Sequence, residues 1–148
     1  MNRYTIVAIF VPFLLPFFVF LIQKQSNNKI VILGEKTFTV EIADTPASHE
    51  RGLSGHKPLL DNQGMFFIFD QPGINRFWMK DMLFSIDIIW ISADMRVVGF
   101  EKSLSPLTYP QSFGPDLSSQ YVLEVSAGQI EKLNIKIGDK VNFIKNNR

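Results

Sequence analysis

The chain contains one stretch in which polar and apolar side chains alternate strictly, Lys36-Thr37-Phe38-Thr39-Val40-Glu41-Ile42-Ala43. Successive side chains of a β-strand point to opposite faces, so the apolar members would lie on one face and the polar members on the other. A period of two therefore predicts a half-buried strand here. The apolar, β-branched residues 29–33 precede it, and the turn Gly34-Glu35 between the two segments predicts a hairpin.

More short apolar runs follow along the chain, and each of them is bounded by turn-forming residues. Further strands are predicted at Met65–Phe69, Phe77–Met79, Phe84–Ser92, Arg96–Glu101, Tyr121–Val125 and Val141–Ile144. The segment 102–120 is rich in proline and serine and predicts a long loop, which in a compact domain is usually functional or mobile.

Two short helices are predicted between the strands. The first begins at Pro46 behind a Thr45 cap and ends at Gly52. The second is expected to begin at a Ser126 capping box with Gln129 and to end at residue 132 or 133. Many short strands with few helices predict a mainly β fold, a compact jelly-roll-like β-sandwich or barrel over residues 30–144.

A hydrophobic leader occupies residues 1–22 and predicts a helix ahead of this domain. The run Tyr4–Ile22 contains no charged side chain, and as a helix it would nearly span a bilayer core of about 30 Å. A cleaved signal peptide and an uncleaved signal anchor both fit; the anchor is favoured because no small-residue cleavage pattern closes the run. We expect an exported, periplasmic or otherwise extracytoplasmic domain, anchored at the inner membrane. Residues 23–29 would be a polar linker and residues 145–148 a basic tail.

Composition excludes several classes of function. The chain has 15 Lys+Arg against 14 Asp+Glu, without the basic excess of a nucleic-acid-binding protein, so no nucleic-acid partner is expected. The absence of cysteine excludes disulfides, thiolate catalysis and zinc–thiolate sites. His49 and His56 are the only imidazoles and lack metal-binding spacing, so we expect no metal site and no cofactor.

Asp87 is the most informative polar position. It shares one face of its predicted strand with Ile89 and Ile91, and an ionised carboxylate on an apolar face must be paired, hydrogen-bonded or neutralised. Asp87 is therefore either a ligand-binding or acid–base carboxylate with a perturbed pKa, or a strand-end carboxylate that binds a loop amide or a nearby cation. Glu124, on another strand, is the second weak candidate for catalysis, as the partner of Asp87 in an acid–base pair.

Other candidates for ligand binding surround the short strand Phe77–Met79. Trp78, Lys80 and Asp81 place an aromatic ring beside charged groups, an arrangement that suits a sugar, a peptide or an anion. Arg51 at the end of the first helix and His56 in the following loop complete the candidate set. Core packing for Trp78 and a local ion pair for Lys80 are the structural alternatives.

The ordered string of motifs resembles the domain-of-unknown-function 192 family, a small bacterial and archaeal domain often found behind a signal sequence. The resemblance covers about residues 30 to 144 and is carried by VEIADTP (40–46), ERGL (50–53), GMFFIF (64–69), FWMKDM (77–82), SIDI (85–88), YVLE (121–124) with Gly128, and IGDKV (137–141). It implies a mainly β fold of jelly-roll or sandwich type and no settled activity, with Trp78, Lys80, Asp87 and Glu124 as the polar residues of the signature. The chain departs from the family pattern after Leu53, where Lys57 is the nearest cation to the family's usual arginine, and at Asp81, where Asn is common.

Three hypotheses about function follow. The first is a non-catalytic, membrane-anchored binding domain for a small molecule, glycan or peptide, with a cleft near Trp78, Lys80 and Asp87. The second is a structural or assembly protein that docks a membrane-protein partner. The third is a hydrolase using Asp87 and Glu124 as acid and base.

Overall fold

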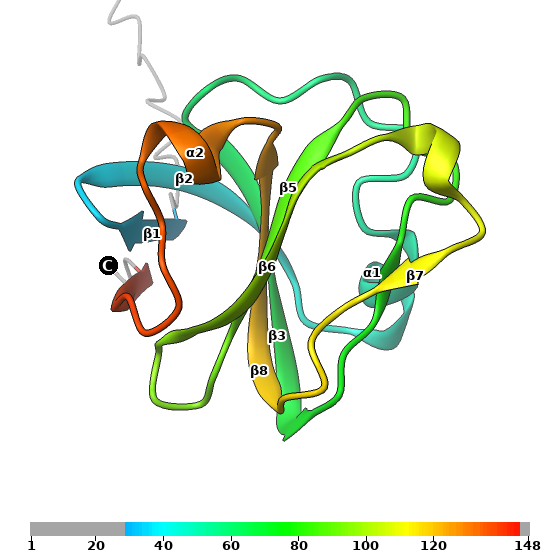
Figure 1. Ribbon diagram of the computed structural model, residues 1–148. Helices are drawn as coiled ribbons and strands as arrows, with labels where there is room; N and C mark the ends of the chain where they lie inside the picture. The colour runs from blue at the N-terminus through cyan, green and yellow to red at the C-terminus, as the bar shows by residue number, and fades with distance from the viewer. Residues whose placement is uncertain (1–28, 146–148) are drawn as a thin grey trace, which may run out of the picture.

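The computed structural model describes residues 29–145 of the 148-residue chain. Within residues 29–145, nine strands, two short α-helices and one 3₁₀ helix follow one another (Figure 1). They are β1 (Lys29–Leu33), β2 (Lys36–Ala43), α1 (Pro46–Arg51), β3 (Gln63–Gly73), β4 (Phe77–Trp78), β5 (Ile86–Ile91), β6 (Val97–Leu104), η1 (Pro106–Thr108), β7 (Ser112–Phe113), β8 (Ser119–Ser126), α2 (Gln129–Lys132) and β9 (Val141–Lys145).

Seven strands form one mixed sheet in the order β6-β5-β8-β3-β2-β1-β9, and β4 pairs with β7 in a separate two-stranded sheet. The prediction of a mainly β domain with two short helices is confirmed. The large sheet is mixed, because β2 and β3 run parallel. The segment that contains α1 connects them.

The two edges of the large sheet meet at one end. Arg96, just before β6, forms a bridge with Lys140, just before β9. Backbone hydrogen bonds reinforce this contact: the Val97 N–H donates to the Asp139 carbonyl over 2.9 Å, and the Gly138 N–H donates to the Val97 carbonyl over 2.8 Å. The sheet is therefore strongly curled, and pairing protects part of its two edge strands.

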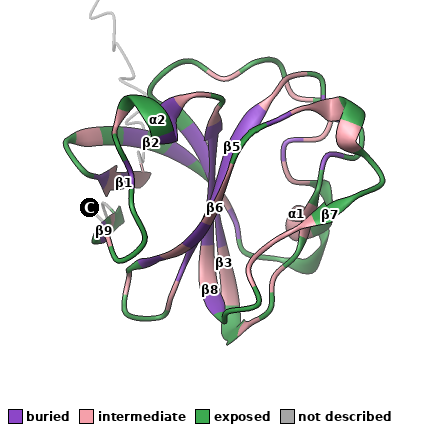
Figure 2. Ribbon diagram, viewed as in Figure 1, coloured by how far each residue is buried: buried purple, intermediate pink, exposed green. Residues whose placement is uncertain are grey.

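The curled sheet has an apolar core on each face. All seven strands contribute to the inner core, which also takes Ile130 and Ile135 from the segment around α2. The outer core involves the central strands together with Leu53, Met79 and Met82 from the connecting segments. Figure 1 shows α2 on one side of the central strands and α1 with β7 on the other, and Figure 2 shows that burial concentrates on the strands between them.

The central strands are buried on both faces, as their continuous apolar runs predict. Every residue of β5 is buried. On β3, Phe66 packs in the inner core and Phe67 packs in the outer core. Gly64 is required in β3, because a Cβ at this position would lie 2.7 Å from the backbone oxygen of Glu124 on β8.

The first helix forms as predicted. The Thr45 side chain accepts from the Ser48 N–H, the Ser48 hydroxyl accepts from the Thr45 N–H over 2.9 Å, and Pro46 occupies the first turn. Gly52 ends the helix with φ of 49°, a left-handed conformation that favours glycine. The predicted hairpin of β1 and β2 is also confirmed, with Val31 opposite Phe38.

Two predictions about the second half of the chain are wrong. Helix α2 has no Ser126 capping box: its N-cap is Gly128, and the Ser126 hydroxyl donates to the Leu59 carbonyl instead. The segment 102–120 is also more ordered than a loop, because it contains the end of β6, η1, β7 and the start of β8.

The leader of residues 1–22 and most of the linker and tail lie outside the described residues. None of the helices found within residues 29–145 is long and apolar enough to cross a membrane.

Candidate functional site

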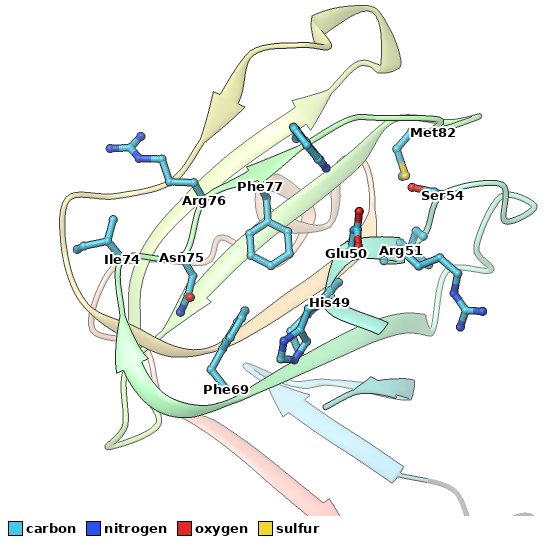
Figure 3. Close-up of a pocket in the computed structure, with 14 residues that line it drawn as sticks. His49, Glu50, Arg51, Ser54, Phe69, Ile74, Asn75, Arg76, Phe77 and Met82 are labelled. Atoms are coloured by element: carbon cyan, nitrogen blue, oxygen red, sulfur yellow. The ribbon is translucent and has the colours of Figure 1, made fainter. Parts of the chain in front are cut away.

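A cavity of about 310 Å³ opens on the outer side of the sheet, between α1, β3 and β4. We call it the aromatic pocket, because phenylalanine rings from β3 and β4 form much of its lining (Figure 3). Its lining residues are His49, Glu50, Arg51, Gly52, Leu53, Ser54, Phe67, Phe69, Ile74, Asn75, Arg76, Phe77, Trp78 and Met82. Its volume is at the lower end of the range for small-molecule sites, so it suits a single ring or a branched aliphatic group.

The rings that line the pocket pack against one another at steep angles. The Phe77 ring meets Phe67 edge to face at 4.8 Å between centroids and meets Phe69 in the same way at 6.5 Å. On the side of the core, it meets Trp90 at 6.0 Å. Edge-to-face packing fixes each ring relative to its neighbours, so the apolar surface of the pocket is already formed.

His49 is fixed by two backbone carbonyls on one side of its ring. Its Nε2 atom lies 3.0 Å from the Ala43 oxygen and 3.1 Å from the Ile68 oxygen, and its ring packs 4.4 Å from Phe69. Because both neighbours are acceptors, Nε2 carries a hydrogen. Within residues 29–145, Nδ1 has no hydrogen-bond partner, so it is available to a bound ligand.

The opposite wall, residues 74–76, is held firmly to the sheet. The Asn75 side chain donates to the Ser119 carbonyl over 2.8 Å, and the Trp90 indole donates to the Asn75 carbonyl over 2.7 Å. Arg76 pairs with Asp116 at 2.5 Å and points out of the pocket in Figure 3. The shape of this wall therefore depends on Trp90 at the centre of the outer core.

Glu124 lies behind the wall of the pocket. Its side chain comes from β8, its residue is only 4% exposed, and its Oε2 atom has no hydrogen-bond partner among the described residues. A Cβ placed on Gly52 would be 3.9 Å from that oxygen and 3.4 Å from the Phe67 ring, so the carboxyl lies close to a residue that lines the pocket. Burial raises the pKa of Glu124 to about 8, which keeps the group protonated at neutral pH.

A second hollow, of about 300 Å³, adjoins the aromatic pocket at the end of α1. We call it the charged hollow; it is lined by Ala47, Glu50, Arg51, Ser54, Lys80 and Asp81. The structure thus brings the sequence candidates Arg51, Lys80 and Asp81 together. Trp78 is close to them, because the Lys80 Nζ atom lies 5.7 Å from the centre of its ring.

Trp78 itself is half exposed rather than buried in the core. Its exposed fraction is 46%, and its ring meets Tyr109, which is 45% exposed, edge to face at 5.9 Å. The two rings therefore form an exposed aromatic pair beside the pocket.

Asp87 and His56 do not belong to this site. Asp87 is fully buried, and its two carboxylate oxygens accept hydrogen bonds from the backbone N–H groups of Ser103 (2.8 Å), Gly128 (3.1 Å) and Ile130 (2.8 Å). It thus anchors the start of α2 and the end of β6. His56 lies 3.6 Å from Glu41 and is separate from both hollows.

The prediction that Asp87 shares a cleft with Trp78 and Lys80 is therefore wrong, because Asp87 points to the inner face of the sheet. The prediction that Asp87 and Glu124 form the acid–base pair of a hydrolase is wrong for the same reason. Asp87 pairs across strands with Val125, and Ile88 pairs with Glu124, so the two carboxyl groups point to opposite faces and cannot act on one bond.

Several residues of the pocket were not recognised in the sequence, namely His49, Glu50, Gly52, Phe69, Asn75, Arg76 and Phe77. One signal was present: Phe67 and Phe69 are two residues apart and must share a face of β3. Nothing in the sequence indicated that α1 and residues 74–76 would stand beside that face. Within the described part of the chain, no three His, Asp or Glu side chains gather in a way that could hold a metal ion.

Residues 29–143 match the family model DUF192, described as Uncharacterized ACR. A UPF0127 protein of Thermococcus gammatolerans is 34% identical over 108 residues, which cover 70% of this chain and 65% of that relative. A UPF0127 protein of Thermococcus kodakarensis is 31% identical, over 70% of this chain and 64% of that relative. The matched part thus spans slightly less than two-thirds of the length of these relatives.

Two crystal structures are similar to this fold. A protein of unknown function from Novosphingobium aromaticivorans has a TM-score of 0.71 and 30% identity, over 78% of this chain and 83% of that one. A putative transcription regulator from Sinorhizobium meliloti has a TM-score of 0.72, over 78% of this chain and 92% of that one, and its 24% identity supports the fold alone. With most of its length matched by the family model, the chain belongs to the DUF192 family of uncharacterised proteins.

Proposed function

We propose that this chain is a non-catalytic binding domain that holds the apolar group of a small ligand in the aromatic pocket. One observation carries the proposal: a preformed cavity lined by aromatic rings lies close to the buried carboxyl group of Glu124, whose Oε2 atom has no hydrogen-bond partner among residues 29–145. Native proteins rarely leave a buried polar atom without a partner, and those that remain often serve function.

The chemistry of the lining supports binding rather than catalysis. The rings of Phe67, Phe69 and Phe77 offer apolar surface, and the Nδ1 atom of His49 offers one polar contact for orienting a ligand. A cavity with an apolar interior and few polar groups is typical of small-molecule sites. The carboxyl groups Asp87 and Glu124 lie on opposite faces of the sheet, so the acid–base pair that a hydrolase would need is not assembled.

The proposal can be tested by saturation-transfer NMR on the full-length protein, with the neutral one-ring probes benzyl alcohol and phenylacetamide. Glu50 gives a matched pair of variants, because it is exposed, lines the pocket and makes no ion pair within residues 29–145. Glu50→Trp adds a large side chain at the mouth of the pocket, whereas Glu50→Gln removes only the charge.

We expect both probes to bind the wild type and Glu50→Gln, and Glu50→Trp to lose at least 80% of the saturation signal. Circular dichroism would confirm that both variants are folded. Absence of signal from the wild type would overturn the proposal, as would equal signal from Glu50→Trp.

We further propose that the domain works outside the cytoplasm, anchored at the inner membrane. The support is the uncharged apolar run Tyr4–Ile22 in the sequence, which precedes a polar segment and then the folded domain.

A further inference from the structure

The aromatic pocket and the charged hollow are neighbours, and we call the pair the groove. Glu50, Arg51 and Ser54 line both of them. In Figure 3, the Arg51 side chain points away from the rings. The groove therefore runs from an apolar end to a charged end.

The charged hollow has a balanced set of charges. Two cations, Arg51 and Lys80, and two anions, Glu50 and Asp81, surround it. Within residues 29–145, none of these four side chains forms an ion pair. Their charges are thus available to a ligand.

The base of the charged hollow is rigid. The Ser54 hydroxyl donates to the Lys80 carbonyl over 2.8 Å, and the Gly55 N–H donates to the Asp81 carbonyl over 3.0 Å. These two bonds join the loop after α1 to the loop after β4. Asp81 also has a φ of 55°, which fixes the direction of its backbone at this junction.

We propose that the groove binds a zwitterionic ligand, with an aromatic or branched apolar side chain in the aromatic pocket and its ammonium and carboxylate groups in the charged hollow. A free amino acid has this chemistry, whereas the terminal residue of a peptide carries only one of the two charges. The inference rests on the proposed function, because it assumes that the aromatic pocket takes the apolar group.

The pattern of charge favours a zwitterion over the other ligand classes. A purely anionic ligand would be attracted by Arg51 and Lys80 but repelled by Glu50 and Asp81. A purely cationic ligand would be attracted by Glu50 and Asp81 but repelled by Arg51 and Lys80. A neutral ligand would use none of the four. A zwitterion can place each of its charges beside a group of opposite sign.

The test is a titration of the full-length protein, followed by saturation-transfer NMR, with L-phenylalanine and three derivatives. N-acetyl-L-phenylalanine lacks the ammonium, L-phenylalaninamide lacks the carboxylate, and N-acetyl-L-phenylalaninamide lacks both. We expect the dissociation constant to rise at least threefold with the loss of either charge and at least tenfold with the loss of both. The dipeptides Gly-Phe and Phe-Gly distinguish a free amino acid from a peptide end, because one of their two charges is displaced along the backbone.

Two variants assign the charges to residues. Arg51→Gln should abolish the preference for L-phenylalanine over L-phenylalaninamide. Asp81→Asn should reduce the preference for L-phenylalanine over its N-acetyl derivative, and asparagine tolerates the left-handed backbone at this position.

The outcomes separate this inference from the proposed function. If L-phenylalanine and N-acetyl-L-phenylalaninamide bind within twofold of each other, or if benzyl alcohol binds and L-phenylalanine does not, the zwitterion proposal is overturned and the aromatic pocket stands. If neither benzyl alcohol nor any phenylalanine derivative binds, the proposed function itself fails.

Discussion

Asp87 on β5 and Glu124 on β8 are close in the register of two paired strands, yet they point to opposite faces of the sheet. Asp87 lies on the inner face with both oxygens hydrogen-bonded to backbone N–H groups. Glu124 lies on the outer face with an oxygen that has no partner among the described residues. The same residue class thus has a structural role on one face and is a candidate for function on the other.

Replacing Asp87 should damage stability rather than binding. Asp87→Ala leaves three backbone N–H groups, one buried and two part-buried, without an acceptor, so we expect the free energy of unfolding to fall by about 3 kcal/mol or more. Urea denaturation measures the change. Asp116→Ala is the control, because it removes an exposed ion pair with Arg76 that should contribute less than about 1 kcal/mol. Equal, small effects of the two variants would contradict the anchoring role.

Glu124 should make the domain less stable as the pH rises. Burial raises its pKa from 4.5 to about 8, so between these values the folded state keeps a proton that the unfolded state has lost. The contribution of Glu124 to the free energy of unfolding should be highest below about pH 4.5. It should fall by about 1.4 kcal/mol per pH unit up to about pH 8 and stay constant above that.

The variant Glu124→Gln tests this dependence. The amide has the shape of the protonated acid and cannot ionise, so the fall in stability between pH 5 and pH 8 should be much smaller than in the wild type. Urea denaturation at a series of pH values measures both proteins. Parallel curves for wild type and variant would show that Glu124 ionises normally in the folded state.

Trp90 links the outer core to the wall of the pocket. Its indole N–H donates to the Asn75 carbonyl, and its ring packs against Phe77. Trp90→Phe removes the donor and leaves space in the core, so we expect a loss of about 2–4 kcal/mol in stability. Hydrogen exchange at residues 74–76 should accelerate more than at β1, which is remote from the pocket. Unchanged exchange at residues 74–76 would mean that Trp90 does not hold the wall.

Local sequence patterns were sufficient for most of the fold. The alternation of 36–43, the Thr45 cap with Pro46 and the stop at Gly52 each depend on residues close in sequence, and each was predicted correctly. The Ser126 capping box failed because a distant residue supplies the cap: the Asp87 carboxylate binds the first N–H groups of α2. The proline and serine content of residues 102–120 predicted a loop, so η1 and β7 were missed. Strand β7 forms because it pairs with β4, which comes from another part of the chain.

The site was only partly predictable for the same reason. The structure places Trp78, Lys80 and Asp81, which stand together in the sequence, beside Arg51 from the first helix. Their relation to Glu124 depends on strand register, because a shift of one residue would exchange Glu124 with its inward-facing neighbour. The parallel pairing of β2 and β3 places α1 over the outer face, and no short-range pattern encodes that pairing.

The leader should keep the protein in the membrane fraction. Tyr4–Ile22 has enough apolar length to anchor in a bilayer, so we expect the full-length chain to resist extraction by alkaline carbonate. A double variant, Leu14→Arg with Phe18→Arg, should move it to the soluble fraction or prevent its export. Protease added to the outer side of the inner membrane should digest the wild-type domain. Protection of the domain from that protease would contradict an extracytoplasmic location.

The central claim is that the aromatic pocket is the ligand site, and chemical-shift mapping of the full-length protein with benzyl alcohol tests it most directly. We predict that the largest changes in the ¹H–¹⁵N spectrum fall at residues 49–54, 67–69 and 76–81, with little change at Asp87 or at β1 and β9. Changes centred on the inner face or the edge strands, or no change at saturating ligand, would contradict it.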